Sequence, residues 1–170
     1  ATSDHIIGPA LKKGTIRKKL VEPHWHCPEG YKVTPIKMNK FDMEMLTPPK
    51  VKSKYIVLQL HGGGYIGRIR NIYRSFAKEY SDMCGGMKVL SIDYRVAPKN
   101  PYPAAMQDAV SAYNWLLSLG YKGEDIIVAG DSAGGGLSLA LSLYLRDHSI
   151  EMPAGLVLMS PWTDLTASGA

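Results

Sequence analysis

One six-residue segment, Gly130-Asp131-Ser132-Ala133-Gly134-Gly135, constrains the fold of this chain more than any other. It follows the apolar run Ile126–Ala129, which is typical of a buried strand, and it opens the apolar, helix-like stretch Ala133–Arg146. A serine nucleophile needs such a sharp strand-to-helix turn, because the turn holds the hydroxyl clear of the sheet. The turn also leaves no space for side chains two residues to either side, which accounts for Gly130 and Gly134. A small-residue turn that only packs a helix closely on a strand is the alternative.

A second glycine-rich segment, His61-Gly62-Gly63-Gly64-Tyr65, follows the buried run Tyr55–Leu60. Its three glycines let the backbone approach a ligand closely and point N–H groups into a cleft. A phosphate-binding loop is the competing interpretation, but no Gly-Lys-Ser/Thr follows and the spacing fits neither common nucleotide fingerprint. We predict an oxyanion loop instead, completed by the N–H groups at the start of the helix after Ser132. The predicted site comprises the nucleophile Ser132, the oxyanion-hole residues Gly63, Gly64 and Ala133, and the loop-shaping residues His61, Gly62, Gly130 and Gly134.

The apolar pattern changes character along the chain. Phe41, Met43 and Met45 alternate with acidic residues, which predicts a half-buried antiparallel strand in a region that is strand-like from about Tyr31. Beyond it, short apolar runs alternate with helical periodicity, which predicts an α/β fold with a mostly parallel, doubly wound sheet. The expected strands span 55–60, 88–93, 126–129 and 156–159, and the expected helix faces carry Ile72, Phe76, Tyr80 and Met83, then Met106, Val110, Tyr113 and Leu117. A shorter amphipathic helix is expected over 11–21.

Composition excludes several classes of protein. The net charge of +5 lies in the first 54 residues, which carry eleven Lys/Arg against five Asp/Glu, without the interleaved aromatics typical of a nucleic-acid surface. We therefore expect a solvated basic face and no nucleic-acid partner. Two cysteines make no disulfide framework, and neither a signal peptide nor an apolar run of membrane-spanning length is visible. These features favour a cytoplasmic protein.

Five motifs in order resemble the hormone-sensitive-lipase-like branch of the α/β-hydrolases, which includes bacterial carboxylesterases and acetyl esterases. They are the two glycine-rich segments above, Tyr94-Arg95-Val96-Ala97-Pro98, Pro101-Tyr102-Pro103-Ala104-Ala105-Met106-Gln107-Asp108 and Ser160-Pro161-Trp162-Thr163-Asp164-Leu165. The resemblance implies the α/β-hydrolase fold, with a cap segment over 1–30 and the N-terminal part of the catalytic domain over 31–170. It also implies hydrolysis of short-chain acyl esters through an acyl-serine, without metal or cofactor. Lys99 departs from the family, which usually has Glu at this position and an ion pair with it.

The catalytic histidine and acid of that family have no counterpart here. The triad order is Ser, then Asp or Glu, then His, and the histidine after Ser132 is His148, at the far end of the predicted helix. His5, His24 and His26 precede the sheet. We therefore expect an N-terminal half, nearly inactive alone, with the missing groups on a second chain or a missing C-terminal segment. The strand at 156–159 would then be an open, association-prone edge, and a homo-oligomer is one possibility.

Other interpretations stay open at this level. A module that binds a small ligand without turnover, on the same fold, would fit the missing histidine. The segment His24-Trp25-His26-Cys27 carries zinc-type ligands, but a fourth ligand is not evident, so no metal site is predicted. Trp25 and Trp162 line the cap and acyl pocket or simply pack, and Asp108 and Asp131 are interpreted as supporting or capping carboxylates.

Overall fold

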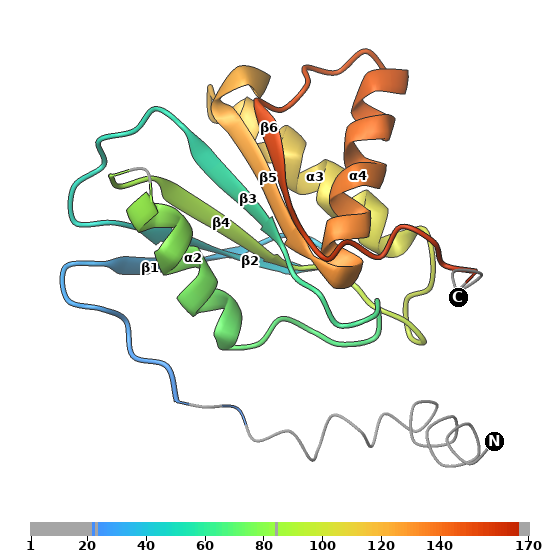
Figure 1. Ribbon diagram of the computed structural model, residues 1–170, viewed down its shortest axis with the longest axis horizontal. Helices are drawn as coiled ribbons and strands as arrows, with labels where there is room; N and C mark the ends of the chain where they lie inside the picture. Colours follow the sequence, from blue (N-terminus) through green and yellow to red (C-terminus); the bar gives the residue numbers. More distant parts are fainter. Residues whose placement is uncertain (1–21, 23, 84, 167–170) are drawn as a thin grey trace.

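The computed structural model of the chain describes residues 22, 24–83 and 85–166. Within these ranges, six strands form a single sheet in the order β1-β2-β4-β3-β5-β6 (Figure 1). In chain order the elements are β1 Lys32–Lys37, β2 Asp42–Thr47, β3 Ile56–Leu60, α2 Ile72–Met83, β4 Lys88–Asp93, α3 Ala104–Ser118, the 3-10 turn η2 Gly123–Asp125, β5 Ile126–Asp131, α4 Ser132–Asp147 and β6 Gly155–Met159.

Strand direction divides the sheet into two parts. The pairs β1–β2 and β2–β4 are antiparallel, whereas β3–β4, β3–β5 and β5–β6 are parallel. This arrangement confirms the predicted antiparallel start and parallel remainder, and each expected strand lies within two residues of its predicted bounds.

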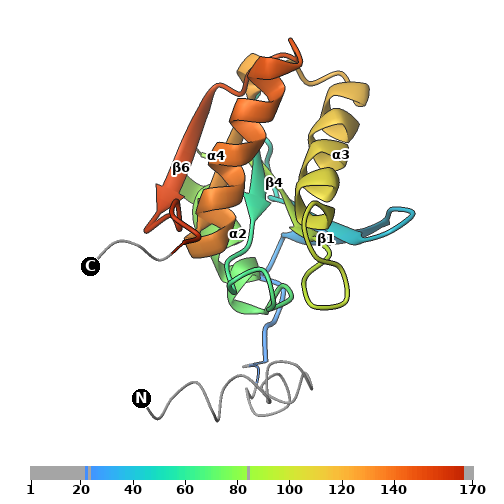
Figure 2. The same ribbon diagram turned by 90° about the vertical axis from the view of Figure 1, so that its right-hand side faces the viewer.

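Helices cover both faces of the sheet. One face carries α2, and the other carries α3 and α4 side by side (Figures 1 and 2). Residues of the central strands therefore alternate between two cores: Leu90 and Ile92 of β4 pack on the α3 and α4 side, whereas Val89 packs under α2. Because both faces are covered, β3 is buried along its whole length, as expected for a central parallel strand.

The buried face of α2 differs from the predicted one. Tyr80 is buried as expected, but Ile72 is 42% exposed and Met83 is 76% exposed. The face against the sheet is made by Tyr73, Ala77, Tyr80 and Ser81. Small residues let the helix axis approach the sheet. The large apolar residues at either end of α2 lie beyond the part of the helix that contacts the sheet.

Helix α3 is rotated from its predicted face for a similar reason. Tyr113 is fully buried as expected, but Met106, Val110 and Leu117 lie only partly buried at the margin of the core. The fully buried positions include Ala109, Ala112 and Leu116. Periodicity weighted by side-chain size misses such a face, because alanine has little hydrophobic weight but permits the closest packing.

Strand β6 lies at one side of the described sheet. Among the described residues β6 pairs with β5 alone, and its Val157 and Met159 side chains are 41% and 38% exposed. Within the same part of the chain, no helix combines the length and apolar character needed to cross a membrane.

The N-terminal cap prediction falls largely on residues that the structure does not describe. The helix expected over 11–21, and residues 1–21 and 23 of the expected cap, lie outside the described residues. The described end of this segment contacts the loop before α2 through Glu22, which accepts hydrogen bonds of 2.7 Å from Arg70 Nε and from the backbone N–H of Asn71.

Candidate active site

The two glycine-rich segments meet at the carboxyl ends of neighbouring parallel strands. The chain runs from β3 to β4 on one side of the sheet and then returns to β5 on the other side. In α/β sheets, ligands bind at such a switch point, outside the carboxyl ends of the strands. Leu60 of β3 pairs with Gly130 of β5, so His61 and Asp131 leave the sheet side by side.

Ser132 occupies the turn between β5 and α4. Its backbone has a φ of +49°, in the left-handed region that non-glycine residues rarely adopt. The residue is exposed and is the first residue of α4. The hydroxyl is therefore presented to solvent at the positive end of a 16-residue helix.

Backbone contacts account for the glycines around Ser132. A β-carbon at Gly134 would lie 2.1 Å from the carbonyl oxygen of Leu60 and 2.6 Å from that of His61. A β-carbon at Gly130 would lie 2.3 Å from the carbonyl oxygen of Gly134. These are contacts with rigid backbone, so the turn can close against β3 only when both positions lack a side chain.

The loop after β3 is held in an unusual conformation. Gly63, Gly64 and Tyr65 have φ values of +113°, +62° and +58°. The carbonyl of Gly63 accepts hydrogen bonds from the N–H groups of Ile66 and Gly67. By contrast, the N–H groups of Gly63 and Gly64 have no hydrogen-bond partner among the described residues. They are the donors expected of an oxyanion loop.

Asp131 links this loop to the serine turn. Its Oδ1 accepts a hydrogen bond of 2.9 Å from the backbone N–H of Gly62, and its Oδ2 accepts one of 3.1 Å from the hydroxyl of Tyr73. The Tyr73 oxygen in turn accepts a second bond, of 2.7 Å, from the Gly62 N–H. Burial, together with the charge of Asp131, raises the pKa of Tyr73 to about 12, so this phenol stays a donor at neutral pH. The two loops are thus joined through one carboxylate.

The side chain of His61 points beneath the loop, toward Tyr94. The side chain is fully buried, stacks on Tyr94 at 3.9 Å between ring centroids, and has Nδ1 2.7 Å from the carbonyl oxygen of Gly62. The hydroxyl of Tyr94 donates a 2.5 Å hydrogen bond to the carbonyl of His61. Burial lowers the pKa of His61, which favours the neutral form of the ring. The buried ring therefore packs under the glycine-rich loop.

A second carboxylate holds the far side of the same loop. Asp93, at the end of β4, accepts hydrogen bonds from the side chain of Arg68 and from the backbone N–H of Ile69. The loop is therefore anchored at both of its ends, by Asp131 near Gly62 and by Asp93 near Ile69.

Among the described residues, no hydrogen bond joins a histidine side chain to Ser132. His148 caps the opposite end of α4, where it stacks on Tyr144, and His24 and His26 are exposed in the N-terminal segment. In the described part of the chain, no group of three or more His, Cys, Asp or Glu side chains could hold a metal ion.

Trp162 borders the site from the segment after β6. Its backbone N–H donates a 2.8 Å hydrogen bond to the carbonyl of Ser132. Its indole lies beside Gly64, with ring centroids 6.3 Å from Tyr65. Trp162 therefore contacts both segments of the predicted site.

Comparison with known proteins agrees with this geometry. A family model described as alpha/beta hydrolase fold matches residues 57–170. An acetyl-hydrolase of Streptomyces hygroscopicus is 42% identical over 114 residues, covering 67% of this chain and 38% of the relative. An esterase of Acinetobacter venetianus is 40% identical over 111 residues, covering 65% of this chain and 36% of the relative. A solved esterase from the bacterial hormone-sensitive lipase family superposes with a TM-score of 0.77 at 32% identity, covering 95% of this chain and 60% of that one.

The fold and the predicted site define an α/β-hydrolase. The chain belongs to the hormone-sensitive lipase family of that fold, whose bacterial members include esterases and acetyl-hydrolases. The resemblance inferred from the motifs and the predicted fold are both confirmed. The chain spans less than half the length of the two curated relatives that it matches.

Sequence reasoning missed the connections beneath the site. Asp131 was predicted as a supporting carboxylate, but its partner Tyr73 was not predicted at all, because Tyr73 is 58 residues away and off the expected face of α2. The sequence carries one local signal for Tyr73, which is an aromatic residue directly after Ile72 at the start of a helix.

Proposed function

We propose that this chain supplies the nucleophile and the oxyanion hole of a serine carboxylesterase that acts on short-chain acyl esters. The observation that carries the proposal is the placement of Ser132. This residue is exposed, in a left-handed turn at the start of α4, beside a loop in which two N–H groups have no hydrogen-bond partner among the described residues. The names of the relatives, esterase and acetyl-hydrolase, support the class of substrate.

In the proposed reaction, the Ser132 oxygen attacks the ester carbonyl carbon while its proton passes to a histidine. The N–H groups of Gly63, Gly64 and Ala133 stabilise the negative charge that develops on the carbonyl oxygen. The alkoxide leaves with the proton from the histidine, which gives an acyl-serine. Water then attacks the acyl carbon by the same route and releases the carboxylic acid.

The histidine and its acid come from residues outside this sequence in this proposal. The support is positional, because the described histidines lie at the far end of α4, beneath the loop or in the N-terminal segment. Without a base, the serine and oxyanion hole retain only a residual effect, roughly 10³–10⁴ over water. We therefore expect negligible turnover by the isolated chain.

Turnover of a chromogenic ester tests the proposal. The protein is purified from its source, its chains are identified by intact mass under denaturing conditions, and hydrolysis of 4-nitrophenyl butyrate is measured for wild type and Ser132→Ala. We expect Ser132→Ala to lower kcat by about 10⁶. The control is Ser111→Ala, whose hydroxyl bonds the carbonyl of Gln107 on α3, away from the site. Saturable ester binding with no turnover in wild type would instead identify a ligand-binding module.

A further inference from the structure

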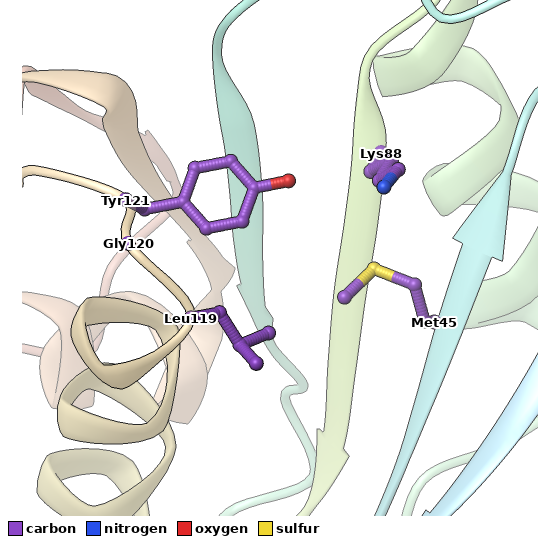
Figure 3. Close-up of a pocket in the computed structure, with 5 residues that line it drawn as sticks. All are labelled: Met45, Lys88, Leu119, Gly120 and Tyr121. Carbon is purple, nitrogen blue, oxygen red and sulfur yellow. The ribbon is translucent and has the colours of Figure 1, made fainter.

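A pocket lies at the opposite end of the sheet from Ser132. It has a volume of about 350 Å³ and is lined by Met45, Lys88, Leu119, Gly120 and Tyr121 (Figure 3). Lys88 is the first residue of β4, and Ser132 follows the last residue of β5, so the length of a six-residue strand, about 17–20 Å, separates the two sites. Its volume is in the range of small-molecule sites.

Two polar groups converge in this pocket. Figure 3 shows the hydroxyl of Tyr121 pointing across the pocket toward the side of β4 that carries Lys88. Neither the Lys88 ammonium nor the Tyr121 hydroxyl has a hydrogen-bond or ion-pair partner among the described residues. The nearby carboxylate of Asp125 is already paired with Lys54 at 2.9 Å. Among the described residues, the pocket thus holds one ammonium group and one hydroxyl without a hydrogen-bond or ion-pair partner.

The remaining walls are apolar. Met45 forms one wall from β2, where it is 9% exposed, and Leu119 forms another at the end of α3, where it is 53% exposed. Gly120 has a φ of +94° and turns the chain from Leu119 to Tyr121, so that both side chains face the pocket. Burial raises the pKa of Tyr121, which keeps the phenol protonated.

We propose that this pocket binds a small amphipathic carboxylate, held between the Lys88 ammonium and the Tyr121 hydroxyl, with its hydrocarbon chain against Met45 and Leu119. The charge of the pocket selects an anion, and its apolar walls select a short aliphatic tail over an inorganic ion. Binding at this pocket does not depend on the proposed esterase activity.

Methyl NMR with octanoate tests the proposal. The chain is labelled at its methionine methyl groups, and octanoate is titrated in. We expect a saturable shift of the Met45 methyl, with a Kd of about 0.1–10 mM, and no shift of the exposed Met83 methyl. Lys88→Gln should weaken binding roughly five- to tenfold, and Tyr121→Phe by a smaller factor.

Matched control variants distinguish binding of octanoate at this pocket from non-specific binding elsewhere on the protein. Lys122→Gln removes an exposed lysine next to Tyr121 and should leave the affinity unchanged. Ser132→Ala should also bind octanoate like wild type, so failure at this pocket is distinguishable from failure of the esterase proposal. Equal affinity in Lys88→Gln, a comparable Met45 shift with octyltrimethylammonium, or equal shifts of all the methionines would overturn the proposal.

Discussion

Gly134 lies where the first turn of α4 crosses the carboxyl end of β3. Its missing side chain leaves room for two backbone carbonyls, those of Leu60 and His61. The spacing of Gly130 and Gly134 around Ser132 could be predicted from the motif, since the steric demand of the turn is local. The hydrogen-bond partners of Asp131 could not be predicted, because the order of the strands brings together residues that are far apart in the sequence.

Gly134→Ala tests this steric account. We expect it to lower the free energy of unfolding by about 1–3 kcal/mol or more, because the new methyl group meets backbone that cannot move aside. The control is Gly155→Ala, where an added β-carbon meets nothing within 4 Å and where the effect should stay within about 0.5 kcal/mol. Urea unfolding measures both, and equal stability of the two variants would contradict the account.

The link between the two loops predicts a local effect of Asp131→Ala. With the carboxylate gone, the N–H of Gly62 retains Tyr73 alone as a partner, so its amide should exchange with solvent about tenfold faster. Asp131→Asn should restore part of the protection, since one acceptor oxygen remains. The control is Asp147→Ala, at the other end of α4, and unchanged Gly62 exchange in Asp131→Ala would refute the link.

Tyr73 makes stability depend on pH in the alkaline range. Its pKa is raised from 10 to about 12 in the folded chain, so above pH 10 the unfolded state loses this proton first. Its contribution to stability is complete below pH 10 and is lost as pH rises toward 12, with a slope of up to about 1.4 kcal/mol per pH unit. Tyr73→Phe should show a shallower loss between pH 10 and 12 in urea unfolding. Identical slopes would contradict this assignment.

At the scale of elements, strands were predicted better than helix faces. Each central strand is a short apolar run that is buried on both sides, and this leaves an unambiguous pattern in the sequence. The faces of α2 and α3 were displaced, because Ala77, Ser81 and Ala109 make the close contacts while larger residues lie at the margins. How closely a helix approaches the sheet depends on both elements together. The hydrophobic periodicity of the helix alone does not encode it.

The connection between β4 and α3 is fixed by one buried ion pair. Asp108 is 3% exposed at its side chain and accepts hydrogen bonds from the Arg95 guanidinium and backbone N–H. We expect Asp108→Ala to cost about 3–5 kcal/mol, because it leaves a partly buried guanidinium without its partner. Asp147→Ala, which breaks the exposed pair with Arg146, should cost less than about 1 kcal/mol. Thermal unfolding compares the two, and similar costs would contradict the assigned role.

At the scale of the whole molecule, the described sheet presents both a site and an open edge. The serine turn and the oxyanion loop meet at the carboxyl ends of β3 and β5, while β6 leaves Val157 and Met159 exposed. Motif order alone was enough to predict the hydrolase fold and family. The proposed function places the histidine and the acid of the triad outside the described residues, so the chemistry at Ser132 has to be tested in the protein as isolated from its source.

Covalent trapping tests the central claim most directly. The protein as isolated is mixed briefly with 4-nitrophenyl acetate, quenched in acid, and mapped by peptide mass spectrometry. We predict one acetyl group on the peptide that contains Ser132, and none on that peptide in Ser132→Ala. Hydrolysis at the wild-type rate in Ser132→Ala, or an acetyl group on another residue that accounts for turnover, would contradict the claim that Ser132 is the nucleophile.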